Sequence, residues 1–208
     1  MLDKILFIIP QYIIPKHLLS KLVGILAKTE ISYVKNFIIK LFIKIYAVNM
    51  KEAYTEDIDL FSSFNAFFTR RLKSNARSID SDQSTVVSPV DGKISQIGRI
   101  GNSSIIQAKG KKYSLVRFLG GDKSLSEKFK FGLFSTIYLS PKDYHRIHMP
   151  YDGRLQQMIY VPGELFSVNP ITVENIDNLF AKNERLVCIF DTSYGQMAIV
   201  LVGAMIVS

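Results

Sequence analysis

Two of the three histidines in this chain of 208 residues, His145 and His148, stand three positions apart. Histidine is the usual general base near neutral pH, so the pair indicates acid/base chemistry. In a strand or an extended loop the two imidazoles point to different faces, whereas in a helical turn they share one. Two alternatives stay open: ordinary surface histidines, or a metal site completed by Asp143 or Asp152.

An aspartate that could support such a histidine lies in Ser88-Pro89-Val90-Asp91-Gly92. The Asp-Gly pair first of all predicts a turn, because glycine tolerates positive φ and aspartate caps turns. Asp91 could also orient a distant imidazole, as the third member of a triad does. Spacing along the sequence does not decide between the two readings.

The segment from Tyr160 to Asn169 predicts a strand, a turn at Pro162-Gly163, and then the apolar pair Leu165 and Phe166. A loop that faces substrate or membrane fits this pattern. Packing of the two apolar side chains in the core fits it equally well.

The composition of the chain predicts the elements that must position these residues. Residues 1–72 are apolar and basic, residues 73–84 are polar and typical of a linker, and residues 85–208 alternate β-branched and aromatic runs with Gly, Pro, Asp and Asn. We therefore predict an α+β fold. Amphipathic helices in the first region precede a β-rich catalytic domain, which is a mainly antiparallel barrel or sandwich.

Two amphipathic helices are expected, at residues 16–28 and 31–48. In the second helix Asn36, Lys40 and Lys44 fall within about 80° of one another, and apolar residues fill the opposite side. Lys35 lies outside the polar sector and would have to extend its ammonium group toward water. Strands are expected at residues 94–97, 134–139, 157–161 and 197–206.

The formal net charge of +8 indicates an anionic partner. Residues 1–50 hold seven lysines against two acidic residues, and apolar faces rimmed by lysine are typical of helices that lie in an anionic membrane surface. A helical bundle packed on the rest of the protein is the alternative. Nucleic acid is disfavoured, because phosphate backbones offer no partner for the large apolar faces.

The apolar stretch near the N-terminus, residues 5–15, contains Pro10 and is too short to span a membrane. Cys188, the one cysteine, lies in an apolar run that predicts a buried thiol.

Taken together, several segments resemble the bacterial phosphatidylserine decarboxylase family, in the family's order and over essentially the whole chain. They are residues 64–72 (FNAFFTRRL), 88–92 (SPVDG), 144–150 (YHRIHMP), 162–169 (PGELFSVN), 183–185 (NER) and 201–204 (LVGA).

The resemblance implies a proenzyme that cuts itself at a Leu-Gly-Ser-Thr type motif near its C-terminus. The family's aspartate and histidine match Asp91 and His148. The histidine would take the serine proton while the aspartate fixes the imidazole tautomer. His145 matches the family histidine near the substrate carboxylate, which implies positioning or proton delivery. Substrate binding is assigned to Phe166 and Ser167.

The implied cofactor is a pyruvoyl group derived from the protein's own serine, which absorbs the electrons left when carbon dioxide departs and phosphatidylserine becomes phosphatidylethanolamine. The implied partners are a phospholipid membrane, the phosphatidylserine substrate and a small α chain that carries the pyruvoyl group. A homo-oligomer stays open. The implied location is peripheral, on the cytoplasmic face of the inner membrane, with no metal.

The sequence departs from the family in one respect, since it contains no Gly-Ser pair. We expect the chain to correspond to most of the β chain, truncated before the cleavage serine; Ser208 does not match that serine. A fragment, a decayed gene and one piece of a split enzyme all fit. The competing functions are an inactive membrane-surface binding protein and a metal-dependent hydrolase that uses His145 and His148.

Overall fold

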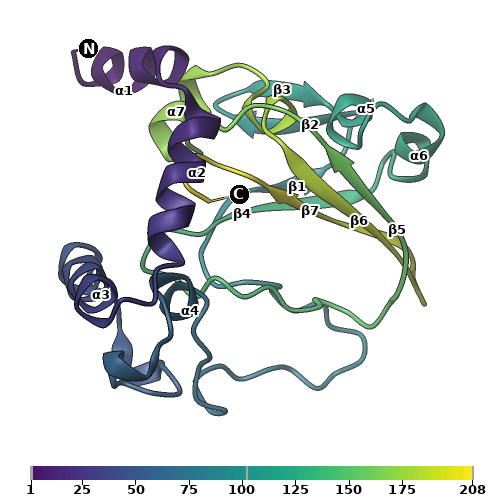
Figure 1. The fold of residues 1–208 in the computed structure, drawn as a ribbon. Helices are drawn as coiled ribbons and strands as arrows, with labels where there is room; N and C mark the ends of the chain where they lie inside the picture. Colours follow the sequence, from purple (N-terminus) through teal and green to yellow (C-terminus); the bar gives the residue numbers. More distant parts are fainter. Residues whose placement is uncertain (1, 102, 208) are drawn as a thin grey trace. The chain divides into compact units, whose positions relative to one another are not determined.

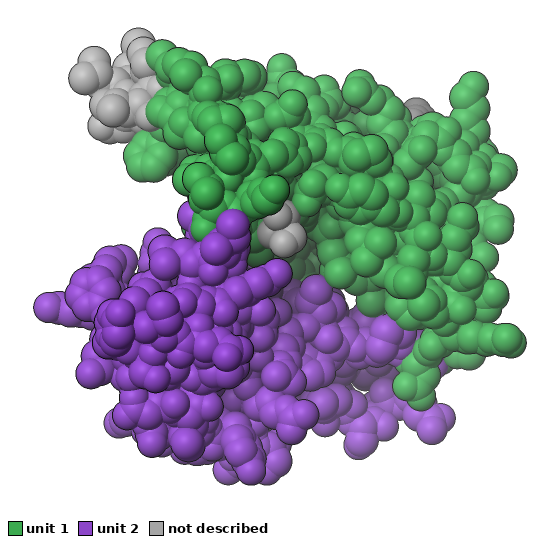
Figure 2. Space-filling view, in the orientation of Figure 1, with its two compact units in different colours: residues 1–22, 94–138, 152–208 green, residues 23–93, 139–151 purple. Residues whose placement is uncertain are grey.

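The structure, a computed structural model, describes residues 2–101 and 103–207. The chain forms two compact units (Figure 2). Unit 1 comprises residues 1–22, 94–138 and 152–208, and unit 2 comprises residues 23–93 and 139–151. Each unit therefore combines segments from both sides of residues 73–84, which lie within unit 2 and contain neither helix nor strand.

The expected helices are present near the N-terminus (Figure 1). The elements there are α1 (Leu2–Ile13), α2 (Lys16–Ala27), α3 (Ser32–Tyr46), α4 (Phe64–Phe68) and the 3-10 helices η1 (Met50–Glu52) and η2 (Ile58–Leu60). Within the described residues, no helix is both long and apolar enough to cross a membrane.

The strands and the remaining helices follow from residue 93 onward (Figure 1). They are β1 (Lys93–Arg99), β2 (Ser104–Ala108), β3 (Lys111–Ser114), α5 (Leu115–Phe118), α6 (Lys123–Lys128), β4 (Leu133–Tyr138), β5 (Arg154–Val161), α7 (Pro170–Asn175), α8 (Leu179–Lys182), β6 (Arg185–Thr192) and β7 (Gly195–Val202).

The mixed helix and strand composition and the antiparallel pairing are confirmed, but the closed barrel is wrong. The described residues form three separate sheets, ordered β1-β4, β2-β3 and β5-β6-β7. Pairing is antiparallel between β2 and β3 and throughout the three-stranded sheet. Among the described residues the strands of each sheet pair only with one another, so no described sheet closes on itself.

The core of unit 1 is apolar and gathers side chains from β2, β3, β6 and the short helices between strands. Its fully enclosed members are Leu119, Ile176, Leu179, Val187 and Ile189. Cys188 is buried too, as predicted, and burial raises the pKa of its thiol. Burial of this apolar surface is the main force that holds the unit together.

Unit 2 is built around an aromatic cluster. Ile39 and Phe67 are fully buried, and Phe42 packs edge-on against Phe67 with ring centroids 6.0 Å apart. Lys35 does not extend to solvent as expected. It is 4% exposed, and its Nζ donates to Asn36 Oδ1 at 2.7 Å and to the Asp59 carbonyl at 3.3 Å, so hydrogen bonds offset the burial of its charge.

Candidate active site

Asp91 lies in a turn that precedes β1. Ser88 Oγ donates to the Val90 carbonyl at 2.7 Å. Gly92 adopts a φ of 135°, a conformation that is strained for residues with a side chain. The predicted Asp-Gly turn is therefore confirmed. The same turn presents the Asp91 carboxylate to its neighbours, so the structural and the functional readings of this segment are compatible.

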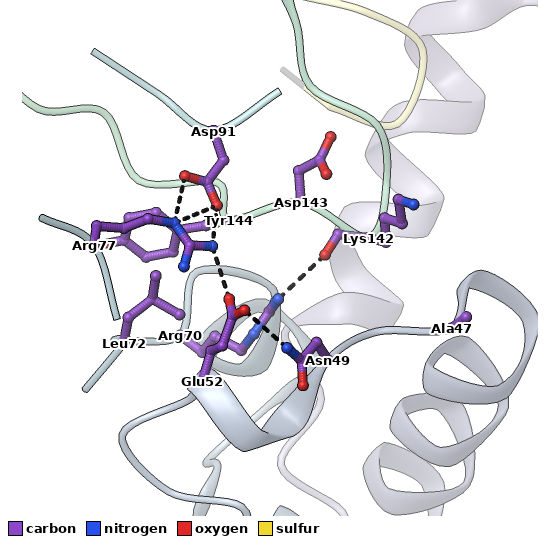
Figure 3. Close-up of a pocket in the computed structure, with 10 residues that line it drawn as sticks. All are labelled: Ala47, Asn49, Glu52, Arg70, Leu72, Arg77, Asp91, Lys142, Asp143 and Tyr144. Atoms are coloured by element: carbon purple, nitrogen blue, oxygen red, sulfur yellow. Dashed lines mark hydrogen bonds and ion pairs between the residues drawn. The ribbon is translucent and has the colours of Figure 1, made fainter. Parts of the chain in front are cut away.

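The Asp91 carboxylate is paired with Arg77 (Figure 3). Arg77 Nε donates to Asp91 Oδ1 at 2.9 Å, and Arg77 Nη2 donates to Asp91 Oδ2 at 2.6 Å. The Arg77 hydrogen bond, opposed in part by desolvation, holds the pKa of Asp91 below its ordinary value. The same Nη2 donates to Glu52 Oε2 at 2.7 Å, so one guanidinium group joins two carboxylates.

His148 lies beside the Asp91 turn, because its backbone N–H donates to the Pro89 carbonyl at 2.8 Å. Its exposed imidazole places Nε2 3.0 Å from the Tyr144 hydroxyl. Within the described residues, no hydrogen bond or ion pair joins His148 to Asp91, so the direct contact of a triad is not formed. The charged fork of Arg77 holds the carboxylate but leaves some of its lone-pair sites open. The two groups still interact electrostatically, and His148 contributes to the lowered pKa of Asp91.

His145 occupies a different environment from His148. Its ring stacks on Phe68 with centroids 4.0 Å apart, and its Nε2 lies 3.1 Å from the Ser140 carbonyl. Because a carbonyl only accepts, this contact requires a proton on Nε2. Burial lowers the pKa of the imidazole. The segment around both histidines is extended rather than helical, and the two rings have different partners, as predicted for an extended loop.

A pocket of about 200 Å³ adjoins Asp91 (Figure 3). It is lined by Ala47, Asn49, Glu52, Arg70, Leu72, Arg77, Asp91, Lys142, Asp143 and Tyr144. Arg70 is 4% exposed, and Nη2 donates to the Lys142 carbonyl at 3.3 Å. Its Nε and Nη1 have no hydrogen-bond partner among the described residues, and burial lowers its pKa. The pocket lining thus combines three cationic and three acidic side chains.

Three segments distant in sequence meet in unit 2. Arg146 Nε donates to the Thr69 carbonyl at 2.7 Å, which ties residues 144–150 to residues 64–72. The backbone contact from His148 to Pro89 ties the same segment to residues 88–92. Folding therefore places a carboxylate, two imidazoles and two arginines in one neighbourhood.

Comparison with known proteins identifies the family. A family model described as phosphatidylserine decarboxylase matches residues 64–208, and one described as PSD matches residues 6–47. The chain is 58% identical over 208 residues to the phosphatidylserine decarboxylase proenzyme of Marinobacter nauticus, covering 100% of the chain and 72% of that relative. It is 56% identical over 203 residues to the proenzyme of Hahella chejuensis, covering 98% of the chain and 69% of that relative. The chain belongs to the phosphatidylserine decarboxylase family. It is therefore an enzyme of the decarboxylase class.

In residues 162–169, the second of the two predicted arrangements is found: Leu165 and Phe166 pack in the core. Leu165 and Phe166 are 2% and 4% exposed. Phe166 lies under Lys16, whose Nζ is 4.5 Å from the ring centroid, and packs edge-on against Tyr12. Phe166 therefore offers no exposed ring for the substrate role assigned to it. The backbone N–H of Ser167 donates to Gln11 Oε1 at 2.9 Å, and the half-buried Ser167 supports the same loop.

Several residues that line the candidate site had not been predicted from the sequence. Arg70 and Tyr144 lie inside segments that carry the family resemblance, which was the available signal. Arg77 lies in the predicted linker and Glu52 in a 3-10 helix, and neither position had a pattern that indicates a site. Within the described residues no group of three His, Cys, Asp or Glu side chains is arranged to hold a metal.

Proposed function

We propose that Asp91 and His148 carry out the self-cleavage of a phosphatidylserine decarboxylase proenzyme. We further propose that the resulting pyruvoyl enzyme converts phosphatidylserine to phosphatidylethanolamine. One observation carries the proposal: residues 88–92 and 144–150 lie side by side in unit 2, joined by the 2.8 Å contact between the His148 N–H and the Pro89 carbonyl. The cleavage serine belongs to a segment outside this sequence, which has no Gly-Ser pair.

His148 is suited to take a proton from that serine. Its imidazole is exposed, so a hydroxyl arriving from another segment can replace the Tyr144 hydroxyl at Nε2. With Nε2 as the acceptor, the ring proton resides on Nδ1. A nearby ionised carboxylate stabilises the imidazolium that forms, which is the role of Asp91.

The residues present fit a pyruvoyl group made from serine, since an accessible base and an ionised carboxylate lie on adjoining segments. When present, the group supplies an electron sink for the departure of carbon dioxide. The chain's own share is to hold the substrate. For His145 we propose positioning of the substrate carboxylate, which requires its Nε2–H to exchange the Ser140 carbonyl for the carboxylate as acceptor.

The test joins this chain to the segment of the Marinobacter nauticus proenzyme that follows the aligned residues. The parent fusion should cleave itself and release carbon dioxide from phosphatidylserine vesicles. Asp91→Asn and His148→Ala should slow cleavage by about 10⁴-fold, as loss of a triad member does. Asp152→Asn and His17→Ala, at exposed positions outside the site, serve as matched controls. Normal cleavage by Asp91→Asn or His148→Ala would refute the assignment. A folded parent fusion that neither cleaves nor decarboxylates would favour the inactive binding protein.

We also propose that α1–α3 hold the enzyme on the cytoplasmic face of the inner membrane. In unit 2, α3 exposes Tyr33, Phe37, Leu41 and Ile45, which follow one another at four-residue spacing, and Lys40 and Lys44 are exposed beside them. In unit 1, α1 exposes Phe7, Ile9, Tyr12 and Ile13. Apolar side chains beside lysines suit an interface with anionic lipid.

Not every lysine of this region contributes to such a surface. Lys16 is 8% exposed, and its ammonium group pairs with Glu164 at 3.0 Å. Lys35 is bonded within unit 2. Lys21, Lys28, Lys40 and Lys44 are exposed and remain available to lipid headgroups.

Flotation with anionic vesicles tests the membrane proposal without any catalytic readout. The double variant Phe37→Ser/Leu41→Ser should weaken vesicle binding by at least about tenfold, because each buried apolar side chain contributes about 1.5–3 kcal/mol. Ile79→Ser, at a position 75% exposed in the coil of unit 2, is the matched control. Binding should also fall with added salt. Equal flotation of the double variant and the parent would exclude the α3 surface. Protease accessibility in spheroplasts tests the assigned face.

A further inference from the structure

We propose that Arg77 is a positioning residue for self-cleavage, which fixes the Asp91 carboxylate and is itself fixed by Glu52. The inference rests on the proposed function, because it requires Asp91 to act on His148. It goes further by assigning a role to a residue in the coil between residues 69 and 92, where no helix or strand holds the chain.

A continuous series of side-chain contacts runs from Asn49 through Glu52 and Arg77 to Asp91 (Figure 3). Asn49 Nδ2 donates to Glu52 Oε1 at 2.8 Å, and Arg77 Nη2 donates to Glu52 Oε2 at 2.7 Å. At the Asp91 end of this series, Arg77 donates to both carboxylate oxygens. Arg77 Nη1 also donates to the Ala76 carbonyl at 2.6 Å. Two anchors other than Asp91, the Glu52 carboxylate and the Ala76 carbonyl, therefore fix the guanidinium plane, and a fixed guanidinium plane orients the carboxylate that it holds.

The coil makes this anchoring necessary. Asp91 sits in a turn, and the turn alone does not restrict the rotation of its side chain. A carboxylate offers about four lone-pair sites, and Arg77 does not exhaust them. The Asp91 carboxylate can therefore stay bound to Arg77 while it stabilises a neighbouring imidazolium. Arg77 thus holds Asp91 ionised and in place next to the His148 segment.

Several charged groups face Asp91 besides Arg77. Arg70 and His148 act on it electrostatically, and both favour the ionised carboxylate. The other titratable groups around the same pocket are Glu52, Lys142, Asp143 and Tyr144. Arg77 is the largest influence on the carboxylate, so its removal should have a measurable effect that the remaining cations do not mask.

The test measures the rate of self-cleavage against pH in the fusion described above. Arg77→Ala should slow cleavage by about 10- to 100-fold, because a misplacement of about 1 Å can cost 100-fold. It should also move the acid limb of the profile to higher pH, because loss of the Arg77 cation favours protonation of Asp91. Arg77→Lys retains the charge, so most of the shift in the acid limb should be reversed while the rate recovers only in part.

Lys73→Ala is the matched control. Lys73 lies in the same coil and pairs with Glu56 at 3.0 Å, but it does not touch Asp91. Its profile should superimpose on that of the parent. A slower Arg77→Ala with an unmoved acid limb would mean a purely structural role and would overturn the inference. Parental or faster cleavage by Arg77→Ala would also overturn it. If Asp91→Asn itself cleaves at the parental rate, the proposed function fails as well. If Asp91→Asn is slow but Arg77→Ala is not, only the role of Arg77 fails.

Discussion

The two units of this decarboxylase each collect three of the segments that resemble the family, but they use them differently. Unit 2 brings together residues 64–72, 88–92 and 144–150, and their contacts surround titratable side chains. Unit 1 brings together residues 162–169, 183–185 and 201–204, and their contacts are hydrogen bonds to the backbone. Segments that resemble the family equally well thus surround titratable side chains in one unit and form backbone-bonded structure in the other.

Asn183 shows the architectural use in unit 1. It is fully buried, and its Nδ2 donates to the carbonyls of Phe166 and Gly203, both at 2.8 Å. Its Oδ1 accepts from the Phe166 N–H at 3.0 Å. One amide therefore joins all three segments and uses both of its N–H donors and its oxygen. Arg77 in unit 2 is 43% exposed and holds two carboxylates at the surface of a pocket.

In this molecule, burial and complete hydrogen bonding mark a structural polar residue. Partial exposure, paired charge and unused bonding capacity mark a residue available for chemistry. Both kinds are polar residues within recognisable segments, so residue type alone does not separate them. Stability measurements on matched residues in the two units test this distinction.

The largest effect is expected at Asn183. Asn183→Ala leaves three buried backbone groups without partners and should lower the free energy of unfolding by about 3–5 kcal/mol. Asn49→Ala in unit 2 removes an exposed cap and should cost about 1 kcal/mol or less. Chemical denaturation measures both variants. Similar losses at the two positions would contradict the contrast between the units.

Two arginines give the next comparison. Arg185 is 3% exposed and donates to four backbone carbonyls, those of Arg117, Phe118, Ala181 and Asn183. Arg185→Met should therefore cost about 3 kcal/mol of unfolding free energy. Arg77→Met should change it by less than about 1 kcal/mol, because exposed ion pairs stabilise weakly. Thermal and urea unfolding measure the loss of unfolding free energy in both variants. A larger loss for Arg77→Met than for Arg185→Met would contradict the prediction.

A smaller effect is expected at Gly163. A Cβ atom there would lie 2.3 Å from the Lys182 carbonyl oxygen, so Gly163→Ala must displace the backbone and should cost about 2 kcal/mol. Gly24 in α2 has no heavy atom within 4 Å of the place that a Cβ would occupy. Gly24→Ala should therefore stabilise the helix by about 0.5–1 kcal/mol. Equal signs for the two changes in unfolding free energy would refute this prediction.

The smallest effect concerns pH. Arg77 lowers the pKa of Asp91 in the folded state, so the pair stabilises the protein above the unfolded-state pKa of about 4. That stability is lost as the pH falls through the lower, folded-state value. The parent should exceed Asp91→Asn by about 0.5–1 kcal/mol at pH 6, because the pair is partly exposed. The difference should vanish in strong acid. Chemical denaturation at several pH values measures this difference in unfolding free energy. A difference that does not change with pH would contradict a stabilising Arg77–Asp91 ion pair.

Regular periodicity made part of the fold predictable. The expected helix at 16–28 corresponds to α2 and that at 31–48 to α3, and the expected strands at 94–97, 134–139 and 157–161 fall in β1, β4 and β5. The last strand ends at Val202 rather than 206, because the chain turns back on itself after Gly203, where the Ala204 N–H donates to the Val207 carbonyl at 2.7 Å. The hairpin of β2 and β3 was missed, since it turns on Lys109-Gly110 rather than on an Asn-Gly or Asp-Gly pair.

The sequence by itself determined the two histidines, the Asp-Gly turn and the amphipathic helices, because each depends on neighbours within a few positions. It also determined the family, because six short segments occur in the family's order along the chain. Only the tertiary structure decided that Arg77 binds Asp91, that Lys16 and Lys35 are buried, and that Phe166 belongs to the core. These outcomes depend on contacts between segments far apart in the chain. A charged side chain finds its partner only after folding has brought that partner close and excluded water from around the pair.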